Sequence, residues 1–138
     1  MSGEHTFLDQ IHRILWLGAD HRRELIRVYV GLTSCSLLTL FIPNAPAQFA
    51  VATIGLALSF YALDLVKKHR AEYEQLRGVI NRFSALHGLE SEPIHKIIAS
   101  FSSWYVWARG IFYVWFVVNS LLFFWASVLF RMFTARLR

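Results

Sequence analysis

Three long apolar blocks dominate this chain and limit what it can fold into. They cover residues 28–42, 49–66 and 110–130, and the last of them contains no charged residue. An α-helix of about 20 apolar residues is long enough to cross the roughly 30 Å hydrocarbon core of a bilayer. The sequence therefore predicts an all-α, multi-pass membrane protein with transmembrane helices at 26–42, 47–66 and 110–130.

Composition supports a single membrane unit of 138 residues. Hydrophobic residues make up 56% of the chain and charged residues only 17%, which is too apolar for a soluble domain of this size. The single cysteine, Cys35, cannot form an intrachain disulfide. The sequence has no Gly-rich phosphate loop, HExxH, CxxC or nucleophile elbow, and its histidines lack metal-ligand spacing. We therefore expect no enzymatic activity, no cofactor and no metal.

The net charge of +5 is explained better by membrane topology than by nucleic-acid binding. Basic residues cluster beside apolar blocks, at 22–27 before the first and at 67–70 after the second. The positive-inside rule predicts that such flanks lie in the cytoplasm, where they also contact anionic lipid head groups. We expect an integral protein of a bacterial inner membrane with a cytoplasmic N-terminus, with membrane lipids as partners and without direct nucleic-acid contacts.

Further helical segments are expected between and before the spans. Residues 6–17 fit an amphipathic helix ended by Gly18, which either packs on its own protein or lies in the membrane interface. Residues 43–47 form a tight turn, which makes the first two spans an antiparallel hairpin. The second span continues without a helix breaker into a cytoplasmic stalk at 67–88, and an interfacial helix is expected at 92–108.

The C-terminal tail gives a conflicting topology signal. Three crossings from a cytoplasmic N-terminus place the tail outside, yet Arg131, Arg136 and Arg138 favour the cytoplasm. Either the two cytoplasmic flanks outweigh the tail, or the third block does not fully cross the membrane. We expect the first, because the hairpin signal comes earlier in the chain.

Small residues form a stripe along the second span. Gln48, Ala52, Gly55, Ser59 and Ala62 project within about a quarter of the helix circumference. Stripes of this kind let membrane helices approach each other closely. The partner is either the first span of the same chain or another copy, and we expect self-association into a homo-oligomer because a short chain has few internal partners.

Polar side chains also occur inside the other two spans. Thr33, Ser36 and Thr39 lie within about a third of the first helix's circumference. Their hydroxyls either bond to their own backbone carbonyls or line a water-filled path where several copies meet. In the third span, Asn119 is expected to hydrogen-bond across a helix interface, because an unpaired amide in hydrocarbon is unfavourable.

The stalk carries a narrow apolar seam suited to packing against another helix. The seam consists of Tyr73, Leu76, Ile80 and Phe83, at spacings of three and four residues. Arg82 and His87 on the same helix have the R-x4-H spacing of the HEPN ribonuclease motif. Their position on a stalk helix, outside any soluble four-helix core, argues against RNA cleavage.

The order of the segments resembles that of several small bacterial membrane proteins. A charged amino end is followed by a tight hairpin and then by a helix running from Lys67–Tyr73 to Asn81–Phe83. Over about residues 20–90 this layout resembles the SLATT and RipA-like families and the membrane accessory proteins of type VI CRISPR loci. The resemblance implies ring-shaped oligomers and, for several members, pore formation in antiphage defence.

Three functions follow as alternatives. The first, which we expect, is a homo-oligomeric pore-forming or membrane-disrupting effector in antiphage defence, triggered by a partner because no nucleotide-sensing domain is recognisable. The second is a non-conducting scaffold that recruits a cytoplasmic protein partner through the stalk helix. The third is a holin-like lysis protein.

Overall fold

Three long helices make up the described part of the chain. The computed structural model describes residues 2–87 and 92–138, with side chains for 8–82, 85, 96, 99, 100 and 102–138. The helices are α1 (Ser2–Phe41), α2 (Ala45–His87) and α3 (Glu92–Arg136). All three are long and apolar enough to cross a membrane. These observations confirm the prediction of an all-α chain with three candidate spans.

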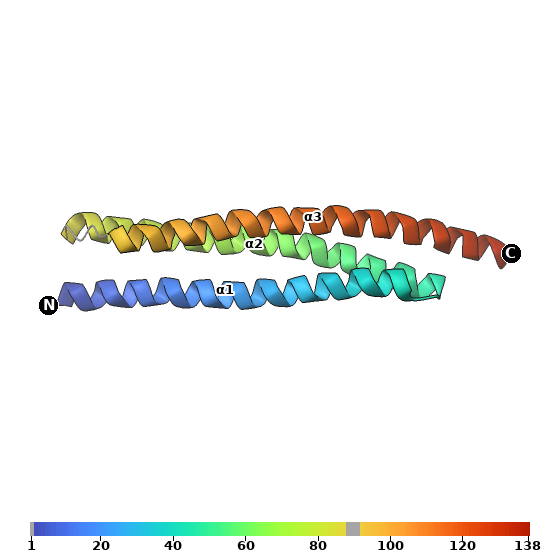
Figure 1. Ribbon diagram of the computed structural model, residues 1–138, viewed down its shortest axis with the longest axis horizontal. Coiled ribbons are helices and arrows are strands. Elements are labelled where there is room, and N and C mark those ends of the chain that lie inside the picture. The colour runs from blue at the N-terminus through green and yellow to red at the C-terminus, as the bar shows by residue number, and fades with distance from the viewer. Residues whose placement is uncertain (1, 88–91) are drawn as a thin grey trace.

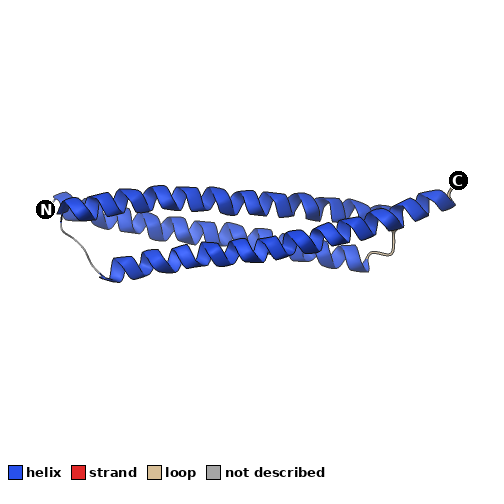
Figure 2. Cartoon of the chain, turned by 90° about the horizontal axis from the view of Figure 1, so that it is seen from above, coloured by secondary structure: helices blue, strands red, loops and turns tan. Residues whose placement is uncertain are grey.

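The helices lie side by side in one elongated bundle and alternate in direction (Figures 1 and 2). The N-terminus, the end of α2 and the start of α3 share one end of the bundle, while the α1–α2 turn and the C-terminus lie at the other (Figure 1). The turn is tight: Pro43 cannot continue a helix, and the side-chain carbonyl of Asn44 accepts a hydrogen bond from the Ala47 amide at 3.3 Å. At about 1.5 Å per residue, each helix is roughly twice as long as a bilayer core is thick.

Buried residues recur at spacings of three and four along the helices, and their packing stabilises the bundle. The repeat is typical of coiled coils, in which a seam of such positions stays turned toward the neighbouring helices. Along α2 the buried members of the seam are Gln48, Ala52, Gly55, Ser59, Ala62, Val66, His69, Tyr73 and Ile80. The small-residue stripe and the stalk seam expected from the sequence are thus two parts of one continuous seam, joined by Val66 and His69.

The bundle divides along its length into two halves with different surfaces. We call residues 28–42, 45–63 and 110–130 the apolar half, and residues 8–27, 64–82 and 96–109 the charged half. The three parts of the apolar half lie at one level, since Tyr29 packs edge-on against Trp115 and Phe60 against Phe116. This half contains no Asp, Glu, Lys or Arg. Phe41 is 79% exposed on its surface whereas Asn119 is 2% exposed inside it. An apolar exterior around polar side chains suits a lipid surrounding.

Two expected helix boundaries do not occur. Residues 6–17 and the first span form the single helix α1, and residues 92–108 and the third span form the single helix α3. Gly18, expected to end a helix, is helical and buried. Glycine lowers helix propensity, but packing against neighbouring helices outweighs that loss, and a missing side chain allows close approach at a seam.

The C-terminal end of α3 lies beside the α1–α2 turn and extends past it (Figure 1). Phe49, near the start of α2, stacks on Phe130 with ring centroids 5.0 Å apart, so the third block runs along the whole apolar half. The expectation that the third block crosses fully with the other two stays a prediction. Arg136 and Arg138 then lie at the end of the bundle opposite the N-terminus.

Candidate functional site

Polar side chains occupy the interior of the apolar half, from the α1–α2 turn to the level of Ser59. Five of them are buried there, namely Ser36, Thr39, Gln48, Ser59 and Asn119. The Gln48 amide donates to the Thr39 carbonyl at 3.1 Å, joining α2 to α1. The Ser36 hydroxyl lies 3.4 Å from the Asn119 side-chain oxygen, joining α1 to α3. We call these five residues the polar row.

Asn119 is the member of the polar row that contacts all three helices. Its amide nitrogen donates to the Trp115 carbonyl of α3 at 2.9 Å, and its oxygen faces Ser36 of α1. The same oxygen lies against Gly55 of α2, at 2.6 Å from where a Cβ would be. The expectation that Asn119 bonds across a helix interface is consistent with these contacts, and Gly55 provides the space that its amide needs.

The small-residue stripe faces the inside of its own chain. Gln48, Ala52, Gly55, Ser59 and Ala62 are all buried within the single bundle. Intrachain packing is therefore the alternative that this structure shows, and self-association through the stripe stays a prediction. A single-helix pattern shows that a close neighbour exists, but it does not show which helix that neighbour is.

The three hydroxyls expected to line a path between copies do not share a water-accessible face. Thr33 is half-buried and donates to the Tyr29 carbonyl at 2.9 Å. Ser36 and Thr39 point into the bundle and also donate to carbonyls four residues back. Two of the three thus belong to the interior of one chain, and a path between copies through them stays a prediction.

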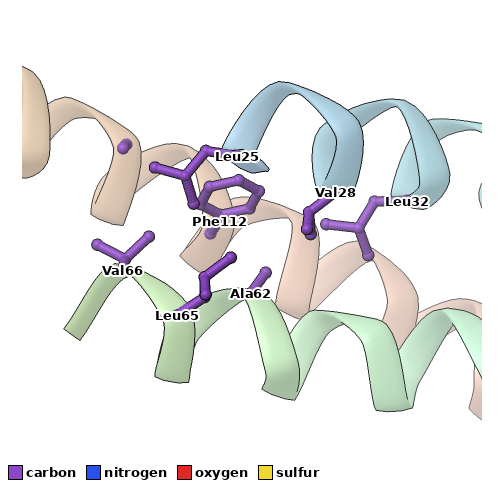
Figure 3. Packing of buried hydrophobic residues seen from close by; sticks show 8 residues of the cluster. Leu25, Val28, Leu32, Ala62, Leu65, Val66 and Phe112 are labelled. Atoms are coloured by element: carbon purple, nitrogen blue, oxygen red, sulfur yellow. The ribbon is translucent and has the colours of Figure 1, made fainter. Parts of the chain in front are cut away.

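A layer of apolar side chains lies where the two halves meet and separates the polar row from the polar side chains inside the charged half. Its buried members come from all three helices and point toward one another (Figure 3). They are Leu25, Val28, Leu32, Ala62, Leu65, Val66, Ala108 and Phe112. We call them the apolar layer. Since Leu32 and Ala62 are fully buried, the layer closes the interior of the bundle at this level.

A second cluster of polar side chains lies on the other side of the apolar layer. The rings of His21 and His69 stack with centroids 3.7 Å apart and nearly parallel planes. His21 Nδ1 lies 2.5 Å from the Tyr105 hydroxyl, and its Nε2 lies 3.2 Å from a Glu72 carboxylate oxygen. His69 Nε2 lies 3.0 Å from a Glu24 oxygen. We call these five residues the histidine cluster.

The donor and acceptor of each hydrogen bond made by His21 can be assigned. Because carboxylates only accept, His21 donates from Nε2 to Glu72 and accepts the Tyr105 proton at Nδ1. Both imidazoles are buried, while both carboxylates are about half exposed and reach solvent. His69 Nδ1 is buried without a hydrogen-bond partner. The interior of the bundle is therefore polar on both sides of the apolar layer.

Sequence reasoning missed the histidine cluster, because His21 and His69 are far apart in the chain. The available signal was their position: His69 continues the α2 seam, and His21 precedes Leu25 and Val28 at the same spacing in α1. Among the described residues, no group of three or more His, Cys, Asp or Glu is placed to hold a metal ion.

The expected stalk seam is filled by the chain's own helices. Tyr73 and Ile80 are buried in a cluster with Ile14 of α1 and Tyr105 of α3, and Leu76 packs against it. The side chains of Phe83 and His87 lie outside the described residues. In this conformation Tyr73 and Ile80 are covered and do not form a surface on which a partner helix could dock.

Tyr105→Phe is expected to destabilise the bundle, because it leaves the buried Nδ1 of His21 without its donor. An unsatisfied buried polar atom costs about 1–3 kcal/mol. Tyr113→Phe is the matched control, since the Tyr113 hydroxyl is exposed and lies 3.4 Å from Arg109. Thermal unfolding of the two variants in the same detergent checks this prediction. Equal unfolding temperatures would mean that the Tyr105–His21 bond contributes nothing.

Comparison of the chain with protein-family models, with curated proteins and with solved structures finds no match.

Proposed function

We propose that this protein is a gated membrane-permeabilising protein whose conducting path is the interior of its own bundle. The observation that carries the proposal is the order of side chains inside the three helices: the polar row, then the apolar layer, then the histidine cluster. In this view the apolar layer is a hydrophobic gate. Such constrictions block ions by excluding water, and they conduct once they are widened or wetted.

The amount of interior polarity supports this proposal over a passive membrane anchor. Polar groups inside a membrane bundle are unfavourable unless paired, and they commonly mark ion or proton pathways. Ser36, Thr39 and Ser59 each have a carbonyl of their own helix as acceptor, so they remain satisfied if the helices separate. A wetted interior would then be lined by groups that need no partner from the other helices.

The charged half is placed in the cytoplasm in this proposal. Its basic residues at 22–27 and 67–70 flank the apolar half, as the positive-inside rule requires of a cytoplasmic side. Each helix runs unbroken from one half into the other. A partner that shifts the helices in the charged half would therefore move the apolar layer as well. Binding of the partner could open the gate in this way.

The path enclosed by three helices is narrow. We therefore expect a single chain to pass protons and small monovalent ions, and larger solutes to pass only when several copies assemble. A scaffold role through the stalk seam is less favoured, because Tyr73 and Ile80 already pack against Ile14 and Tyr105.

The double substitution Ser36→Ala and Thr39→Val is expected to abolish potassium leakage from vesicles that contain the purified protein. It removes two interior hydroxyls with little change of volume. The matched control is Ser34→Ala with Thr53→Val, since both residues are exposed on the outside of the apolar half. The control should leak as the wild type does, measured with a potassium electrode and corrected for the amount of inserted protein.

Two results would contradict this proposal. Equal leakage from the interior and the control variants would remove the polar row from the path. Leakage no greater than from protein-free vesicles, both for the wild type and for a variant with the apolar layer made polar, would rule out permeabilisation by the interior of the bundle.

A further inference from the structure

A cavity of about 380 Å³ lies between α2 and α3 where the apolar half meets the charged half. Three cationic side chains line it: Lys67 and Arg70 from α2 and Arg109 from α3. We propose that this cavity binds a phosphate group, which in the membrane is the head group of an anionic phospholipid. This site does not depend on the proposed permeabilisation.

The charge in the cavity is available for an anion. Among the described residues, no carboxylate lies within ion-pair distance of Lys67, Arg70 or Arg109. Asp64 is the acidic lining residue, and Lys68 pairs with it at 3.0 Å. The cavity therefore carries a net positive charge. Guanidinium groups match phosphate oxygens through paired hydrogen bonds, and a lysine adds a point charge.

The walls of the cavity favour a lipid over a soluble phosphate. Leu63 and Tyr113 line the end toward the apolar half, and Arg70 lines the end toward the charged half. A phospholipid changes from polar to apolar in the same direction, with its phosphate at the membrane boundary and its acyl chains in the hydrocarbon core of the membrane. Basic pockets between membrane helices on the cytoplasmic side are known to hold such head groups.

The cavity also touches the histidine cluster. Tyr105 lines the cavity and bonds to His21 through its hydroxyl. A bound head group would thus lie against a residue that holds the buried polar core of the charged half together. The ligand would contact α2 and α3 directly and α1 through the Tyr105–His21 bond.

The test measures retention of phosphatidylglycerol relative to phosphatidylcholine by the full chain, using native mass spectrometry from micelles with equal amounts of both lipids. The variant is Arg70→Gln with Arg109→Gln. The matched control is Arg23→Gln with Arg27→Gln, which removes two exposed charges from α1, outside the cavity lining. The wild type should retain phosphatidylglycerol preferentially, and the cavity variant should lose on the order of tenfold of that preference.

The control variant should lose clearly less of the preference for phosphatidylglycerol than the cavity variant does. An equal loss in both double variants would mean that the preference comes from overall surface charge, and it would overturn the site, as would a wild type without any preference. Titration of inorganic phosphate in phosphatidylcholine micelles distinguishes the two sources. Thermal stabilisation by inorganic phosphate that depends on Arg70 and Arg109, without a lipid preference, would assign the cavity to a soluble phosphate and overturn the lipid assignment.

Discussion

Gly55→Val is expected to lower the stability of the bundle strongly, because the apolar half has no room for a side chain at this position. A Cβ on residue 55 would lie 2.6 Å from the Asn119 oxygen and 3.3 Å from the Cys35 Cβ. Asn119 cannot simply move away, since it is buried and bonded to the Trp115 carbonyl. Overpacking of this kind costs about 1–3 kcal/mol, and displacing the buried amide adds a similar amount.

The matched control for this prediction is Gly110→Val. Gly110 also lies within a long helix, and a Cβ there would meet nothing within 4 Å. Valine has a higher helix propensity than glycine, so this variant should be as stable as the wild type or more stable. Thermal unfolding in detergent, followed by circular dichroism, checks both. A Gly55→Val protein that unfolds at the wild-type temperature would contradict the three-helix contact at Asn119.

The three spans and the hairpin were predictable because their signals are local. Hydropathy over one block predicts one apolar helix, and Pro43 marks the turn without reference to the rest of the chain. The continuity of α1 and α3 was not predictable in the same way. Gly18 and Gly110 weaken helix propensity locally, but packing between helices decides whether the helix continues, and that packing involves residues distant in the sequence.

The candidate site was predicted in part, for a related reason. The residue types that fill the interior were recognised from the patterns on each helix, including Asn119 and the stripe around Gly55. Their partners were not, because a seam on one helix does not identify the helix that covers it. Only the arrangement of all three helices brings Gly55 against Asn119 and stacks His21 on His69. The stripe and the stalk seam are likewise one seam once Val66 and His69 are seen to be buried.

The largest functional effect is expected from making the apolar layer polar. Val28→Thr together with Leu32→Thr places two hydroxyls among side chains that otherwise exclude water. Each hydroxyl lowers the unfavourable free energy of hydrating the layer by about 1–3 kcal/mol. If that free energy is the barrier to conduction, the leak of potassium should rise by about fivefold to about 150-fold per hydroxyl. Both threonines can bond to carbonyls four residues back, as Thr33 and Thr39 do, so the helix is retained.

The control for this prediction changes the same residue types on the outside of the same helix. Val30→Thr with Leu38→Thr alters side chains that are 56% and 50% exposed, whereas Val28 is 8% exposed. Both double variants make the same two replacements, Val to Thr and Leu to Thr, on the same helix within the apolar half. A leak that rises only for the interior pair locates the gate inside the bundle. Equal leaks from both pairs would mean that the hydroxyls act by disturbing the protein–lipid boundary, and the apolar layer would then serve packing alone.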